Sequence, residues 1–214
     1  MNAWETSGIV TAISAMVGGS LAVLAGKLWE SLDARKSENR FLDTQYFCQL
    51  QLSIQLLCER LQNLLKEFGG SVMSSDYRRS TTLYALACPL ALERMFFLDG
   101  VYPRIHNRNK LLESHLRTGS LDTQLKGFNF HRYDRIALAE CAIVYGDSRL
   151  RLATYFEFRN QYEKAITRND EWIKSAQVFA DGITSEKYRG RIEQIQSALE
   201  DTAKKLVRVT KLAN

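Results

Sequence analysis

The feature that most constrains this chain is an apolar run without a single charge, residues 6–26. A helix needs about 20 apolar residues to cross the hydrocarbon core of a bilayer, and this run has that length. Trp4 and Trp29 lie on either side of it, where aromatic side chains settle at the two membrane interfaces. The sequence therefore predicts a transmembrane helix in the lipid bilayer, within an anchor domain of residues 1–29.

The charges beside the run predict its orientation. Its N-terminal side carries only Glu5, whereas its C-terminal side carries Lys27, Arg35, Lys36 and Arg40, mixed with Glu30, Asp33 and Glu38. Basic residues stay on the cytoplasmic side. We therefore expect a single pass through the inner (plasma) membrane, with the N-terminus outside and a cytoplasmic domain of residues 30–214. Two alternatives stay open: a cleaved signal peptide, although the start lacks basic residues, and a hairpin buried in a soluble oligomer.

Small residues recur through the same run at spacings of 4, 3, 4, 3 and 4. They are Gly8, Ala12, Ala15, Gly19, Ala22 and Gly26. This spacing places them on one face of a helix, and membrane helices associate where small side chains let the backbones approach. The pattern predicts packing between membrane helices and a homo-oligomer. The alternative is that Gly and Ala are simply common in such helices.

The rest of the chain has the pattern of a helical bundle. Only two prolines occur in 214 residues, and apolar residues return at spacings of 3 and 4 from residue 47 to residue 68. These are Phe47, Leu50, Ile54, Leu57, Leu61, Leu64 and Phe68. We interpret them as the core-facing stripe of a bundle helix, with a coiled coil as the alternative. The predicted fold class is all-α, an N-terminal transmembrane helix followed by a cytoplasmic helical bundle.

Further helices are expected from caps and apolar patterns. A central helix, apolar all round, begins at Ser74 or Ser75 and ends near residues 99–100. We expect Glu93 and Arg94 on it to reach the surface; the alternative is pairing inside the core. The remaining expectations are a turn at 101–107, a short helix at 108–116, a loop-like segment at 117–129, a helix at 133–144, one or two helices over 149–180 with a break at 167–170, and a last helix from 184 or 185.

Charge and exposed aromatics bear on partners. The net charge is +5, and Glu5 is the only charged residue among the first 26. A basic body suits an anionic membrane surface or a nucleic acid, and an ordinary solvated surface explains it equally well. The loop-like segment and the alternating aromatic and basic residues that follow it, together residues 117–135, are the candidate contact for a protein partner.

No pattern for a metal or a cofactor is present. The cysteines, Cys48, Cys58, Cys88 and Cys141, form no CxxC pair, and the three histidines lack close ligand partners. Free thiols in a reducing compartment are the simplest explanation. Without a Ser-His-Asp set or a glycine-rich phosphate loop, the sequence favours a protein that is not an enzyme, with no cofactor and no metal.

One short pattern points toward catalysis. Residues 108–115 (RNKLLESH) contain an arginine, a polar residue, five further residues and a histidine. This pattern resembles the R-x(4–6)-H motif of HEPN-domain ribonucleases, which are all-helical and often dimeric. The resemblance implies a metal-independent ribonuclease in which Arg108 and His115 approach the scissile phosphate and Asn109 supports them. The alternatives are a surface helix with an incidental Arg and His, or a pairing that involves Arg104 or His106.

The layout of the whole chain is similar to HEPN-like single-pass membrane accessory and effector proteins of CRISPR and other antiviral systems, some of which form rings or pores. Three hypotheses follow. The first is a self-associating membrane protein that is a defence-type effector or accessory and forms a membrane assembly or pore. The second is a membrane-tethered HEPN-like ribonuclease, and the third is a non-enzymatic membrane adaptor.

Overall fold

The structure, a computed structural model, describes residues 27, 29–37, 40–66, 75–126, 128, 130–146, 150–183 and 185–211. The chain divides into two units, Met1–Asp43 and Thr44–Asn214. Residues 1–26 lie outside the described part, so the membrane helix and its six small residues, Gly8 to Gly26, stay a prediction. In the first unit, residues 29–37 form a helix whose side chains are all exposed.

The second unit is mostly helical, which confirms the all-α prediction at that level, and it contains one β-hairpin. A short π-helix, Asp43–Phe47, precedes its first long helix. The elements are α2 (Cys48–Lys66), α3 (Ser75–Leu98), α4 (Val101–Arg108), α5 (Lys110–Thr118), α6 (Leu121–Gln124), α7 (Arg132–Cys141), β1 (Ile143–Tyr145), β2 (Leu150–Leu152), α8 (Tyr155–Thr167), α9 (Glu171–Gly182), a 3-10 helix (Glu186–Tyr188) and α10 (Arg189–Lys211).

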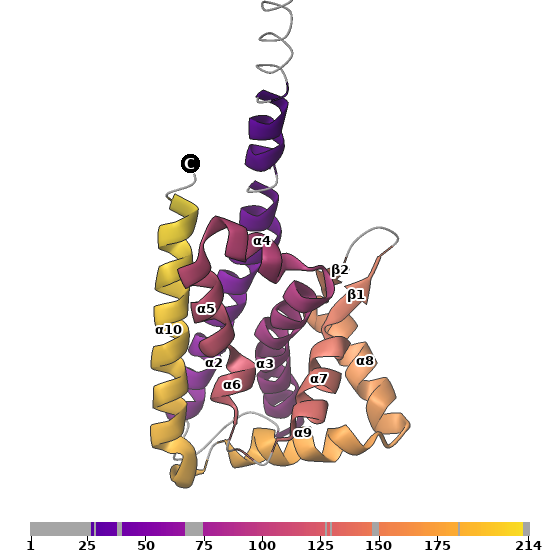
Figure 1. Ribbon diagram of the computed structural model, residues 1–214. Helices are drawn as coiled ribbons and strands as arrows, with labels where there is room; N and C mark the ends of the chain where they lie inside the picture. Colours follow the sequence, from indigo (N-terminus) through magenta and orange to yellow (C-terminus); the bar gives the residue numbers. More distant parts are fainter. Residues whose placement is uncertain are drawn as a thin grey trace, which may run out of the picture. The chain divides into compact units, whose positions relative to one another are not determined.

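Helix α3 is the centre of this unit. It lies between α2 and α7 and also contacts α4, α6, α8 and α9 (Figure 1). Many of its large apolar side chains, among them Leu83, Leu92 and Phe96, are almost completely buried. Within the described residues, its span Asp76–Leu98 is the one helix long and apolar enough to cross a membrane. Because most of that span is buried inside the unit, its apolar character is that of a core helix.

The heptad stripe of α2 is also part of this core. Phe47 and every described stripe residue from Leu50 to Leu64 are buried, and α2 packs against α3 and α10. Helix α10 contributes Ile192, Ile195 and Leu199 to the same interior. The core-facing interpretation of the stripe is therefore confirmed.

The segment 101–107, which we expected to be a turn, is helix α4, so that prediction is wrong. Gly100 has a φ of 61°, which separates α3 from α4 in a conformation that glycine adopts easily. Pro103 lies in the first turn of α4, where a backbone N–H has no partner within the helix. Proline there is compatible with a helix start, and its presence alone does not indicate a turn.

The loop-like prediction for residues 117–129 is wrong in part. Helix α5 continues to Thr118, and Ser120 caps the short helix α6 by accepting a hydrogen bond from the Thr123 amide. Leu121, Leu125 and Phe128 are buried. The segment therefore contributes to the core, and its apolar residues were too few and too irregular to indicate this.

The expected helix at 133–144 ends early. Helix α7 stops at Cys141, and Ile143–Tyr145 pairs antiparallel with Leu150–Leu152, with Ile143 opposite Leu152. The β-branched pair Ile143 and Val144 favours a strand over a helix end. The predicted break near residue 168 is confirmed: Asn169 has a φ of 57° between α8 and α9.

Candidate functional site

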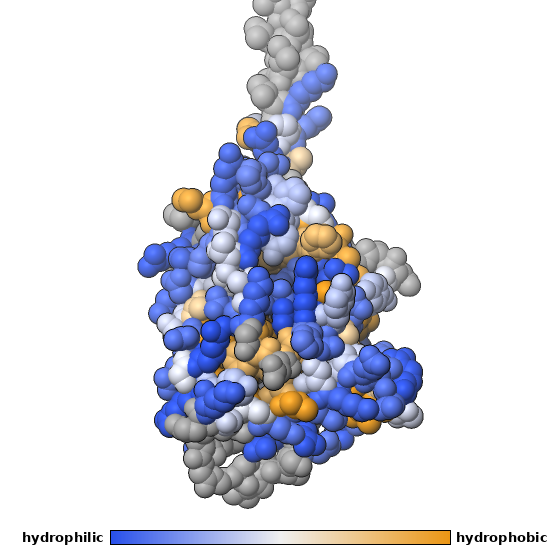
Figure 2. All heavy atoms as spheres, turned by 60° about the horizontal axis from the view of Figure 1, so that its bottom comes forward, coloured by the Kyte–Doolittle hydropathy of each residue, from blue (hydrophilic) through white to orange (hydrophobic). Residues whose placement is uncertain are grey.

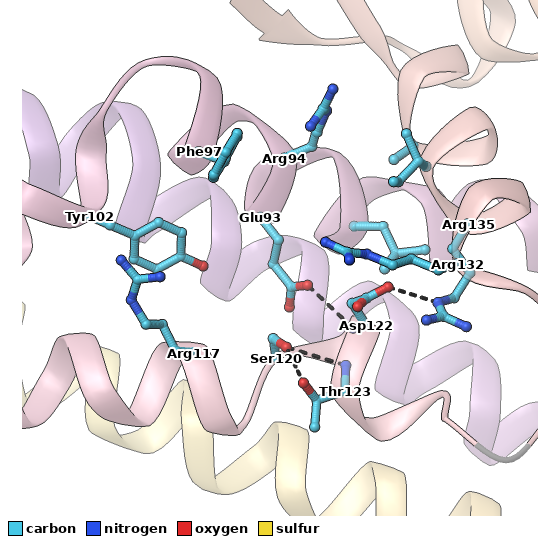
Figure 3. A pocket seen from close by; sticks show the side chains of 13 residues that line it. Glu93, Arg94, Phe97, Tyr102, Arg117, Ser120, Asp122, Thr123, Arg132 and Arg135 are labelled. Carbon is cyan, nitrogen blue, oxygen red and sulfur yellow. Dashed lines mark hydrogen bonds and ion pairs between the residues drawn. The ribbon is translucent and has the colours of Figure 1, made fainter.

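A pocket of about 290 Å³ lies between α3, α4, the α5–α6 region and α7 (Figure 3). We call it the arginine pocket because four arginines line it. Its charged and aromatic lining consists of Arg94, Arg117, Arg132, Arg135, Glu93, Asp122, Phe97 and Tyr102. Helical spacing explains the convergence, since Glu93 and Phe97 are four residues apart on α3 and Arg132 and Arg135 are three apart on α7.

Glu93 lies at the inner wall of the pocket. Its carboxyl group accepts hydrogen bonds from the backbone amides of Leu121 at 2.6 Å and of Asp122 at 3.3 Å. Burial raises the pKa of Glu93 from its usual 4.5 to about 8, although these two bonds act in the opposite direction. The expectation that Glu93 reaches the surface is met only in part, because the residue is intermediate in exposure. Its carboxyl lines the pocket and holds the start of α6 against α3.

Arg135 has a structural position in the pocket wall. It is only 5 % exposed, and its Nε donates to Asp122 Oδ1 at 2.8 Å. Its Nη1 donates to the carbonyl oxygen of Phe130. A buried guanidinium needs such partners, so Arg135 ties α7 to α6.

The other three arginines keep more of their donors available. Arg117 pairs with Glu113 on its own helix, and its guanidinium lies 4.3 Å from the centre of the Tyr102 ring. Arg94 is 3.5 Å from Glu140, and its Nε is buried without a hydrogen-bond partner in the described part of the chain.

Arg132 differs from all of these. It is exposed, and it makes no ion pair with any residue that the structure describes. Figure 3 shows its side chain extending from α7 into the pocket. Arg132 and Arg135 belong to the aromatic and basic patch noted in the sequence, and Arg117 begins the same candidate segment, residues 117–135. No local signal connected Glu93 to them.

The residues of the HEPN-like pattern lie at a second place, between α5 and α10. A groove of about 390 Å³, which we call the His115 groove, is lined by Asn109, Leu111, Leu112, His115, Lys205 and Arg208. The structure thus brings Asn109 and His115 to one groove. Arg108 ends α4, and its side chain lies outside the described part.

The ring of His115 is held between two side chains of α10. Lys205 Nζ is 3.2 Å from Nδ1, and Thr202 Oγ1 is 3.2 Å from Nε2. An ammonium group only donates, so Nδ1 accepts and the ring proton is on Nε2. Burial, followed by the charge of Lys205, lowers the pKa of His115. Both causes favour the neutral imidazole, whereas Asp201 acts in the opposite direction.

Asn109 already has a structural task. Its side-chain oxygen accepts a hydrogen bond from the Leu112 amide at 3.0 Å, as the N-cap of α5. The predicted short helix accordingly begins at Lys110, two residues later than expected. The catalytic assignment of Arg108, Asn109 and His115 stays a prediction.

No protein-family model, curated protein or solved structure matches the chain. Within the described ranges, no group of three or more His, Cys, Asp or Glu side chains is placed to bind a metal ion.

Proposed function

We propose that this chain is a self-associating single-pass membrane protein that presents its helical body to the cytoplasm as a defence-type effector or accessory, forming a membrane assembly or pore. The observation that carries the proposal is the charge-free run of residues 6–26 with six small residues at heptad spacing. In such an arrangement the helix both anchors the chain and brings copies of it together.

Three features of the structure support the proposal. Helix α3, which is long and apolar enough to cross a membrane, is mostly buried in the body. Its apolar character is that of a core helix, so residues 6–26 remain the candidate membrane helix. The helix at residues 29–37 is exposed on all sides, and Trp29 is 68 % exposed, as suits an aromatic residue at a membrane interface. The visible face of the body in Figure 2 is mostly hydrophilic, with apolar residues in scattered groups.

The test is the mass of the particle extracted in mild detergent. The triple variant Ala15→Leu, Gly19→Leu, Ala22→Leu adds bulk on the predicted contact face and should reduce a large particle to a smaller one. The control is Ser14→Leu with Ser20→Leu, because at 3.6 residues per turn these positions lie away from that face. A wild-type monomer, or an assembly unchanged in the triple variant, contradicts self-association through this helix.

A second candidate function, the membrane-tethered ribonuclease, is favoured by the composition of the His115 groove. A neutral imidazole can accept a proton, and Lys205 and Arg208 beside it suit a phosphate backbone. His115→Ala should abolish RNA cleavage without added metal. His131→Ala is the control, since His131 is exposed and does not line the groove. Cleavage by the purified chain that survives His115→Ala rules out this mechanism.

The adaptor hypothesis rests on residues 117–135. Tyr133 is 84 % exposed, and His131 and Arg132 beside it are exposed as well. Exposed aromatic and basic side chains of this kind are common at the centres of interfaces. Tyr133→Ser should therefore remove a co-purifying protein. Phe156→Ser should not, although Phe156 on α8 is an aromatic residue of similar exposure.

A further inference from the structure

We propose that the arginine pocket binds a small organic phosphate with a planar ring, of the size of a nucleoside monophosphate. This ligand is independent of self-association in the membrane and of the His115 groove. The pocket lies entirely within the second unit, and its residues come from separate helices packed around α3.

The balance of charge favours an anion. Of the four arginines, Arg135 is buried and already donates to Asp122 and to a backbone carbonyl. Arg132 has no ion pair among the residues described, and Arg94 has a buried Nε without a hydrogen-bond partner there. A buried donor left unpaired needs an explanation, and an anion at this place would supply its acceptor.

A phosphate fits these donors better than a carboxylate does. Arg94 and Arg132 come from different helices, α3 and α7, and both line the pocket. Phosphate offers oxygens in three directions, whereas a carboxylate is satisfied by one bidentate arginine. Glu93 opposes an anion less than its formal charge suggests, because its raised pKa of about 8 favours the protonated form at neutral pH.

The remaining wall suits a flat apolar group. Phe97 is 67 % exposed on the pocket side of α3, and Leu90, Ile136 and Ala139 add apolar surface. An aromatic ring that stacks on a nucleobase contributes favourable free energy to binding. Arg117 lies 4.3 Å from the centre of the Tyr102 ring, and Arg94 lies 5.9 Å from the centre of the Phe97 ring. Because its cation is further away and most of its side chain is exposed, Phe97 is the main stacking surface.

The volume limits the size of the ligand. Pockets that enclose drug-sized ligands measure about 300 to 1,000 Å³. At about 290 Å³ the arginine pocket is at the lower limit. A single nucleotide therefore fits this volume better than a dinucleotide or an extended nucleic acid strand.

The experiment is calorimetric titration of the full chain in nanodiscs of zwitterionic lipid with AMP, GMP, adenosine and inorganic phosphate. We expect a nucleoside monophosphate to bind, and both adenosine and inorganic phosphate to bind at least about tenfold more weakly, because each lacks one of the two groups recognised. Arg132→Gln should weaken nucleotide binding by about 10- to 100-fold. Arg132→Lys should restore part of it.

The matched control is Arg159→Gln, which removes the same charge from α8, outside the pocket. Equal losses in both variants would reveal non-specific attraction and overturn the proposal. So would the absence of nucleotide binding down to a dissociation constant of about 1 mM, or an affinity that Arg132→Gln leaves unchanged. Repeating the titration in nanodiscs with anionic phospholipid identifies the source of the phosphate. If AMP binding disappears there, the occupant is a lipid headgroup and the nucleotide proposal fails.

Discussion

The arginine pocket and the His115 groove are both basic, and both include residues of α5, yet they are built differently. The groove is formed by α5 and the end of α10, and its residues from Asn109 to His115 belong to the short pattern noticed in the sequence. The pocket is formed by residues from α3, α4, α5, α6 and α7 that share no local pattern. In the groove, Asn109 and both ring nitrogens of His115 have partners. In the pocket, Arg132 has none within the described residues.

The difference teaches that spacing in sequence and availability for a ligand are separate properties. Asn109 fits the ribonuclease pattern in the sequence. In the structure it is the N-cap of α5, directly after α4. Glu93 and Arg132 lie far apart in the sequence, but the fold brings them to one pocket, where Arg132 makes no ion pair with a described residue. Four predictions, from the largest expected effect to the smallest, separate structural tasks from ligand binding at these two places.

The first concerns Glu93. Its pKa is 4.5 in the unfolded chain and about 8 in the folded one, so the native state binds more protons between these values. The free energy of unfolding should therefore fall as the pH rises from about 4.5 to about 8, by a few kcal/mol. The titratable and charged groups that interact with the carboxyl are Asp122, Arg135 and Tyr102. Arg94, Arg117 and Arg132 line the same pocket.

In Glu93→Gln this dependence on pH should flatten, because the amide keeps an acceptor for the Leu121 amide without titrating. Urea unfolding at a series of pH values measures it. Glu163→Gln, on the exposed side of α8, is the control and should retain the wild-type slope. An identical slope in Glu93→Gln would contradict a raised pKa of this carboxyl in the folded state.

The second prediction compares two arginines of one helix. Arg135→Met breaks the pair with Asp122 and should cost about 3 kcal/mol of unfolding free energy, because it leaves a carboxylate and a carbonyl without their donor. Arg132→Met should change it by less than about 0.5 kcal/mol. Chemical denaturation of both variants gives the comparison. Similar losses would show that Arg132 is structural, which weakens its role as a ligand donor.

The third prediction concerns the cap of α5. Asn109→Ala should lower the unfolding free energy by about 1 kcal/mol, since the Leu112 amide loses its acceptor. Asn109→Asp keeps an acceptor oxygen and should remain close to wild type. Thermal unfolding of the pair distinguishes capping from a purely catalytic role. If Ala is as stable as Asp, the cap contributes nothing.

The fourth prediction is a shift in titration without a large change in stability. The pKa of His115 should lie below 6.5 and should rise in Lys205→Gln, because a cation beside Nδ1 is removed. Lys204→Gln removes the same charge from a side chain that does not contact the ring. An NMR titration of the imidazole protons measures both. Equal shifts would show that only the general field of α10 acts on the ring.

How much was predictable depended on the length and periodicity of each element. Long amphipathic or wholly apolar stretches gave α2, α3 and α10 correctly, and the polar residues near Asn169 gave the break between α8 and α9. Helix α4, helix α6 and the β-hairpin were missed because each is short. Short elements take their conformation from the surface they pack on, and the period of their own residues is too brief to read.

The candidate site was harder to predict than the fold. Arg132 and Arg135 appeared in the sequence as one basic and aromatic patch, but nothing local separated the exposed arginine from the buried one. Glu93 was expected at the surface because a lone carboxylate in an apolar helix is costly to bury. Its cost is offset by two backbone amides at the start of α6, nearly thirty residues further along the chain.

The sequence by itself determined the mostly helical class, the core-facing stripe of α2 and the central place of α3, because these follow from residue periodicity and apolar composition. Only the tertiary structure decided that Glu93, Arg117, Asp122 and Arg132 line one pocket, and that Asn109 and His115 are held by neighbouring groups. The physical reason is that periodicity is encoded within a few turns of chain, whereas a site depends on which faces of distant helices pack together and which polar groups that packing leaves unpaired.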